Sequence, residues 1–183
     1  VLALDAAYFP IPKSAESSRS IQLKVQAEWK IMLSGSFRAD LRLVERFRTW
    51  GDMFRTDMRA DLRWFSGKWN AVLRLNALKC SGWGLLGYAE GGYVSGSFSL
   101  YGRMGAFRID DWDDRIYVYE RNAPGTFSVP AYYGRGVWAA FTAGWKYARW
   151  GKLYARAAVV TYPFMIQKKP GKAELKLQCM FDF

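Results

Sequence analysis

Apolar and polar residues alternate along most of this chain, and this period of two constrains the fold more than any other feature. Eight segments place an apolar residue at every second position: residues 21–33, 37–43, 58–64, 69–77, 94–106, 137–147, 153–161 and 173–183. Because a β-strand points successive side chains to opposite faces, such segments predict strands with one apolar and one polar face. No segment shows a convincing helical period. The sequence therefore predicts an all-β fold of about ten strands.

The connections between the predicted strands differ in length at the two ends of the fold. Turn-forming residues predict tight turns at 34–36, 65–68, 91–92 and 149–151. Between them lie the connections 10–19, 49–53, 80–82, 110–135 and 163–171, all but one of which are longer. Tight turns at one end and longer loops at the other are typical of up-and-down membrane barrels. We expect residues 1–183 to form a single domain with a long external loop at about 110–135.

Charged residues fall on one side of the alternation, whereas the apolar side carries none. We expect the charged side to line a lumen through ten residues: Arg38, Asp40, Arg42, Asp57, Arg59, Asp61, Arg63, Arg74, Arg103 and Arg156. A closed ring with lipid outside and a polar interior leaves no backbone group stranded in hydrocarbon. The pattern predicts an antiparallel up-and-down transmembrane β-barrel of about ten strands, or the C-terminal part of a larger barrel. A soluble all-β binding domain with an aromatic core is the alternative.

The predicted lumen has two interpretations. A barrel of ten strands is only a little wider than the eight-stranded size whose interior is filled by side chains. This argument favours a packed, ion-paired lumen. The basic residues also permit an anion path, because Arg and Lys rings select anions in pores.

The chain finishes with AELKLQCMFDF, and its alternation continues to the last residue. The apolar positions are Ala173, Leu175, Leu177, Cys179, Phe181 and Phe183. This segment resembles the closing strand of bacterial outer-membrane barrels, which ends in Phe and is read by the barrel-assembly machinery. The resemblance implies a bacterial outer-membrane location with a periplasmic C-terminus. It also implies contact with outer-membrane lipid and lipopolysaccharide, and with the assembly machinery during biogenesis.

Catalytic and cofactor chemistry find little support in the sequence. The chain has no histidine, the residue that most often acts as a general base near neutral pH, and we expect no enzymatic activity and no cofactor. Cys80 and Cys179 have no metal-type spacing, and we expect two unpaired thiols. The segment RIDDWDDR offers a divalent-cation site because hard oxygen ligands suit Ca²⁺ or Mg²⁺. We favour a solvated acidic loop tip formed by Asp110, Asp111, Asp113 and Asp114, with Tyr132 and Tyr133 on the same external loop.

Residues 101–136 resemble the C-terminal barrel of Bacteroidota outer-membrane proteins described as helix-hairpin-helix-containing. The matching positions are Asp113, Arg115, Ile116, Tyr117, Tyr119, Glu120, Phe127, Pro130, Tyr132, Tyr133, Gly134 and Gly136. The resemblance implies a barrel and an envelope location. It carries no DNA-binding role to this chain, which has no such hairpins. The formal charge of +11 suggests nucleic acid, but the lysines 168, 169 and 172 fit a solvated loop, and nucleic acid is not expected as a partner.

Together these patterns predict an integral outer-membrane barrel without enzymatic activity. We expect a structural or accessory component of an envelope complex that docks other envelope proteins through its external loops. A small anion-selective channel with a basic lumen is the main alternative, and a soluble all-β binding domain is the other.

Overall fold

The computed structural model describes residues 1–10, 19–49, 53–165 and 169–181. Ten strands form one antiparallel sheet in which each strand pairs with the next one of the sheet along the chain. They are β1 (Leu2–Phe9), β2 (Ser20–Met32), β3 (Phe37–Arg48), β4 (Met53–Ser66), β5 (Trp69–Lys79), β6 (Trp83–Val94), β7 (Phe98–Ile109), β10 (Gly134–Lys146), β11 (Gly151–Thr161) and β12 (Lys172–Phe181). The predicted all-β, up-and-down order of about ten strands is confirmed.

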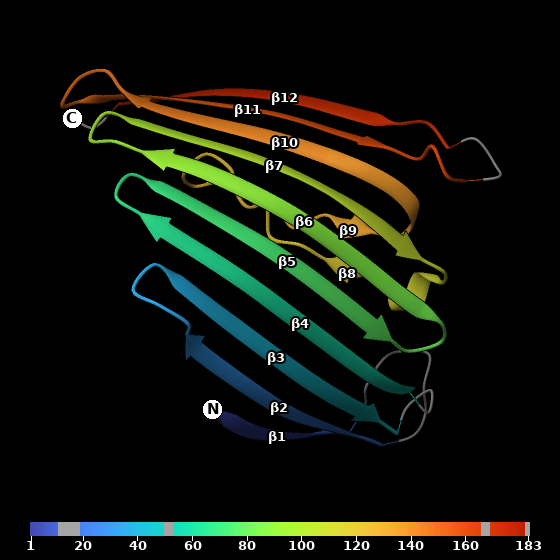
Figure 1. The fold of residues 1–183 in the computed structure, drawn as a ribbon. Coiled ribbons are helices and arrows are strands. Elements are labelled where there is room, and N and C mark those ends of the chain that lie inside the picture. The colour runs from blue at the N-terminus through green and yellow to red at the C-terminus, as the bar shows by residue number, and fades with distance from the viewer. Residues whose placement is uncertain (11–18, 50–52, 166–168, 182–183) are drawn as a thin grey trace.

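The sheet is strongly curved but open at its two edges (Figure 1). In the part of the chain that the structure describes, β1 pairs only with β2, and β12 pairs only with β11. Closure of the ring therefore stays a prediction. None of the described residues forms a helix long and apolar enough to cross a membrane.

The short turns all lie at one end of the sheet, together with both ends of the chain, and the longer connections lie at the other end (Figure 1). The turn between β4 and β5 has only two residues, and Gly67 adopts a φ of +56° there, which L side chains rarely adopt. One predicted turn is wrong. Gly91 and Gly92 lie inside β6, and the chain turns at 95–97 instead. Two adjacent glycines resemble a turn signal, but at Gly92 the lack of a side chain serves close packing, because a Cβ there would lie 2.4 Å from the Tyr101 ring.

The connection between β7 and β10, residues 110–133, folds back under the sheet; we call it the insert. It contains the 3-10 turn Trp112–Asp114 and a two-stranded ribbon of β8 (Ile116–Tyr117) and β9 (Ala131–Tyr132). The ribbon lies on the concave side of the sheet (Figure 1). The expectation of a solvated loop tip needs correction for Asp114, which is 0% exposed, and Tyr132 of the same segment is 3% exposed. The external position of the segment stays a prediction.

The core lies between the insert and the concave face of the neighbouring strands. Tyr132 packs against Trp138 and Phe107, with ring centroids 4.5 and 5.1 Å apart. The buried cluster consists of Leu78, Leu86, Tyr88, Phe107, Ile109, Ile116, Val118, Tyr132 and Trp138. Both thiols are free; Cys80 packs against this cluster and Cys179 is exposed.

The convex face is apolar over most of its height. Alternation and register place four charged residues of the described strands on it, all in two neighbouring cross-strand rows near the loop end: Glu45, Lys79, Arg108 and Arg135. At the short-turn end, aromatic rings pair across strands. Phe98 stacks on Trp145 with centroids 5.8 Å apart, and Trp150 stacks on Phe181 at 6.0 Å.

Candidate functional site

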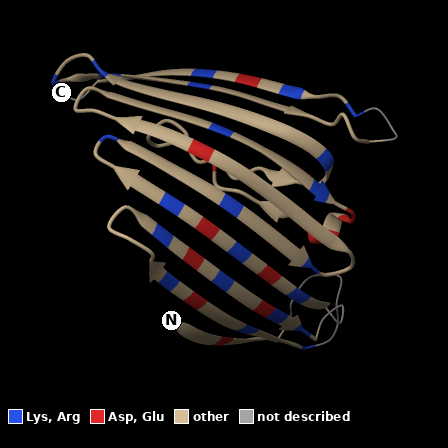
Figure 2. Ribbon diagram, in the orientation of Figure 1, with Lys and Arg blue, Asp and Glu red and all other residues tan. Residues whose placement is uncertain are grey.

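The concave face gathers the charged residues that the sequence assigned to a lumen. The strand registers place all ten predicted positions on this face. They do not form one site, because they divide between an ion-paired group on β3–β5 and a second group that binds the insert (Figure 2). Asp57 lies one row nearer the loop end than the first group, between Val44 and Leu78.

We call the first group the charge ladder: Arg38, Asp40, Arg42, Arg59, Asp61, Arg63 and Arg74. Its centre is Asp61, whose side chain is fully buried. Arg74 donates two hydrogen bonds to this carboxylate, from Nε at 2.5 Å and from Nη2 at 2.7 Å. Arg63 donates a third at 3.1 Å, and Arg59 Nε lies 3.7 Å away. A bidentate hydrogen bond from an arginine holds the carboxylate in a fixed orientation.

The register within the ladder places like charges directly opposite each other. Between β3 and β4, Asp40 faces Asp61, and Arg38 faces Arg63. Like charges in this arrangement are destabilising. The structure offsets them diagonally, because Arg63 Nε lies 3.0 Å from Asp40 Oδ2. The sequence predicted attraction between opposite charges on neighbouring strands. Only the register shows that the attracting residues lie diagonally to each other and not directly opposite.

The second group holds the insert through Glu90, which lies on β6 and is 6% exposed. Arg103 on β7 donates to Glu90 Oε2 from Nε at 2.9 Å and from Nη2 at 2.6 Å. Arg103 Nη1 also donates to the Tyr119 carbonyl at 2.7 Å, and Arg121 Nε donates to Glu90 Oε1 at 3.0 Å. The Glu90–Arg103 pair therefore links β6 and β7 to Tyr119 and Arg121 of the insert.

Between those two insert residues, Glu120 makes the most enclosed contacts. Its carboxylate is paired with Arg156 of β11 and accepts a hydrogen bond from the Tyr132 hydroxyl at 2.5 Å. Arg156 is 4% exposed and also pairs with Glu174 of β12. Burial, together with the hydrogen bond to Glu120, raises the pKa of Tyr132, so that its hydroxyl remains a donor.

The loop end of the insert is fixed by Asp114 and Arg55. The Asp114 carboxylate accepts from the backbone amides of Cys80 at 2.7 Å and Gly82 at 2.5 Å. Arg55 of β4 donates to the carbonyls of Asp113 and Arg115 at 3.4 and 3.3 Å. A side chain at Gly84 would meet the Asp114 carbonyl at 2.5 Å, so glycine is needed for this close approach.

Sequence reasoning missed Glu90, Glu120, Arg121 and Arg55 as site residues. Glu120 lay within the segment RIYVYE, but alternation gave no sign that it meets Arg156. Glu90 lay in a glycine-rich stretch whose strand phase was not evident. A buried glutamate needs a charged partner, and this rule would have marked Glu90 and Glu120 only after their burial was known.

The four aspartates of the predicted acidic tip have separate partners. Asp110 lies 3.5 Å from Arg108 and 3.4 Å from Arg135, and Asp111 caps the 3-10 turn through the Asp113 amide at 3.0 Å. Asp113 lies 3.7 Å from Arg115, whereas Asp114 is turned toward the sheet. Among the residues that the structure describes, no group of three or more Asp, Glu, Cys or His side chains is placed to hold a metal ion.

The remaining predicted positions lie at opposite ends of the molecule. Leu175, Leu177, Cys179 and Phe181 all point to the convex face of β12, while Phe183 lies outside the described residues. Their role as an assembly signal stays a prediction. At the loop end, Tyr133 is partly exposed and Lys169 Nζ lies 3.5 Å from its ring centroid. Lys168 also lies outside the described residues.

Comparisons with known proteins identify fold similarity alone. No protein-family profile matches the chain, and no curated protein sequence matches it. Two solved structures, a KdgM porin and a KdgM porin in complex with disordered oligogalacturonate, align with TM-scores of 0.45 and 0.46. Each covers 100% of this chain and 91% of the porin chain at 10% identity. At these values neither similarity assigns a function to this chain. The resemblance of residues 101–136 to the Bacteroidota proteins stays a prediction.

Proposed function

We propose that the protein is an integral outer-membrane β-barrel with a structural or accessory role and no enzymatic activity. One observation carries this proposal: the two faces of the sheet have opposite chemistry. The convex face is apolar and uncharged except in two neighbouring rows near the loop end, and the concave face holds the paired charges. Lipid outside and a polar interior have this distribution. Aromatic pairs at the short-turn end suit a membrane–water boundary.

The accessory role is supported by the way in which the insert occupies the concave face. A segment tied by ion pairs to β6 and β11 and by a hydrogen bond to β7 narrows any passage along that face. Several aromatic side chains of the insert nevertheless stay exposed and offer a surface to a partner: Trp112, Tyr117, Tyr119 and Phe127. Aromatic residues are enriched in protein interfaces.

The test is the behaviour of the purified protein. The folded barrel should require detergent, should migrate faster in unheated than in heated gel samples, and should co-purify with stoichiometric partners from native membranes. A protein that stays monomeric and fully soluble without detergent would contradict the membrane assignment. A detergent-dependent, heat-modifiable protein that never retains a partner would contradict the accessory role.

A second function, passage of small anions, is favoured by the composition of the charge ladder. Five arginines surround two aspartates there, and this leaves an excess of positive charge on the half of the concave face away from the insert. If this path conducts, planar-bilayer recordings in a KCl gradient should give a reversal potential closer to the chloride equilibrium potential than to the potassium equilibrium potential. The D40N variant removes one negative charge from the ladder and should shift the reversal potential further toward that of chloride. Absence of discrete conductance in the wild type would exclude this function.

A further inference from the structure

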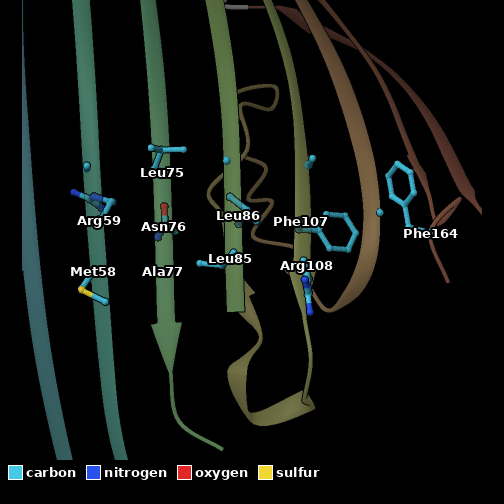
Figure 3. A pocket seen from close by; sticks show the side chains of 14 residues that line it. Met58, Arg59, Leu75, Asn76, Ala77, Leu85, Leu86, Phe107, Arg108 and Phe164 are labelled. Carbon is cyan, nitrogen blue, oxygen red and sulfur yellow. The ribbon is translucent and has the colours of Figure 1, made fainter. Parts of the chain in front are cut away.

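A groove of about 600 Å³ lies on the convex face, near the loop end of β4–β7 (Figure 3). Its walls are the side chains of Met58, Leu75, Leu85 and Phe164, its floor includes Ala106, and Arg108 stands at its loop end. Leu75 and Leu85 are 58% and 48% exposed, so that the groove opens away from the insert. It is therefore separate from the ion-paired concave face described above.

The register explains why the sheet is hollow at this place. Two neighbouring cross-strand rows meet in the groove, one through Met58, Ala77, Leu85 and Arg108, the other through Ala60, Leu75, Gly87 and Ala106. Small residues at the centre of these rows leave space between larger walls. Farther from the loop end, Gly91 and Gly102 face each other across β6 and β7, and a Cβ at either position would meet nothing within 4 Å.

The loop end of the groove is basic. Arg108 of β7 and Arg135 of β10 are directly paired in the register, and their side chains are 63% and 48% exposed. Both lie near one carboxylate oxygen, Asp110 Oδ1, at 3.5 and 3.4 Å. A single aspartate between two arginines leaves a net positive charge. Lys79 adds a further cation one row nearer the loop end.

We propose that this groove binds an acidic lipid that carries a phosphate, with an acyl chain along the groove and the phosphate at Arg108 and Arg135. The inference rests on the proposed membrane location. Arginine presents a planar fork that matches phosphate oxygens, and the apolar walls match a hydrocarbon chain. A peptide fits less well, because the lining has few groups that satisfy backbone hydrogen bonds.

The test uses the full chain, purified in nonionic detergent, and native mass spectrometry to measure bound lipid. The probes are phosphatidylglycerol, phosphatidylcholine with the same acyl chains, and inorganic phosphate. We expect the wild type to bind phosphatidylglycerol about tenfold more tightly than phosphatidylcholine, a difference equal to about 1.4 kcal/mol. The R108Q/R135Q variant should lose this preference. The control K146Q/K172Q removes the same charge from the concave face and should keep it.

Three results would overturn the inference: equal binding of both lipids by the wild type, a preference that survives in R108Q/R135Q, or displacement of the lipid by equimolar inorganic phosphate. The last result would mean a free-anion site. The variant A106F tests the groove itself, because it fills the floor and leaves both arginines in place; it should weaken phosphatidylglycerol binding.

Gel heat-modifiability of the same preparations separates this inference from the proposed function. A heat-modifiable barrel without lipid preference contradicts the groove alone. A protein that needs no detergent contradicts both the groove and the membrane location.

Discussion

The two halves of the concave face differ in what covers the inner surface of the sheet. On β2–β5, charges of both signs alternate along neighbouring strands and pair with one another (Figure 2). On β6–β12, charges are few, and the insert covers an apolar cluster with buried ion pairs at its edge. The ladder arginines Arg59 and Arg63 keep 26–28% of their side-chain area exposed, whereas Arg156 keeps 4%. The comparison teaches that one face of a sheet can carry charged side chains that pair with one another, or can be covered by a long connection between two of its own strands.

The largest difference between the halves should appear at Glu120. The variant E120Q leaves Arg156 and the Tyr132 hydroxyl without their buried carboxylate, and breaking a buried pair costs about 4 kcal/mol of unfolding free energy. The measurement is denaturant unfolding in detergent micelles, followed by tryptophan fluorescence. The matched variant E28Q changes a carboxylate of β2 that lies 3.5 Å from the ladder residue Arg42 and is 24% exposed, and it should cost less than about 1 kcal/mol. Equal losses would abolish the distinction between the halves.

A smaller loss is expected at the centre of the ladder. The variant D61N removes the carboxylate that Arg74 and Arg63 share and leaves neighbouring arginines to repel one another, at a cost of about 2 kcal/mol. Because Arg59 and Arg63 keep 26–28% of their side-chain area exposed, added salt should screen the repulsion between the arginines and reduce the loss.

The salt dependence of D61N has its control in E120Q, whose effect should hardly change between 0.05 and 0.5 M KCl, values chosen to span about a threefold change in Debye length. Unfolding curves at both salt concentrations give the comparison. A salt-independent loss of unfolding free energy in D61N would mean that water and salt reach the ladder no better than the buried contacts under the insert.

The smallest effect should come from one hydroxyl group. The variant Y132F keeps the ring contact with Trp138 but removes the hydrogen bond to Glu120, at a cost of about 1.5 kcal/mol. The neighbouring variant Y133F provides the control, because Tyr133 is partly exposed and its contact with Lys169 uses the ring face. Unfolding free energies of the two variants that differ by less than about 0.5 kcal/mol would contradict the enclosed position of the Glu120 contact.

Much of the fold was predictable because alternation is a local property. A period of two marks a strand, and the segregation of charge marks which side chains share a face, so the ladder residues such as Arg38 and Asp40 were identified before any contact was known. The turn prediction failed at Gly91 and Gly92, which lie within a strand, and Gly92 serves close packing against Tyr101 there. The insert was expected to extend the strands or to fold over the lumen mouth, and the contacts that bury Asp114 and Tyr132 were not foreseen.

The sequence by itself determined the strands, the polar and the apolar face, and the absence of histidine chemistry, because each depends on residue type and on spacing along a few neighbouring positions. Only the tertiary structure decided which charges meet, where the insert lies, and where the convex face is hollow. Glu120 meets Arg156 across 36 positions of chain, and Arg108 meets Arg135 across the whole insert. Contacts at such separations depend on strand register and on how a long connection folds back, and neither leaves a periodic mark in the sequence.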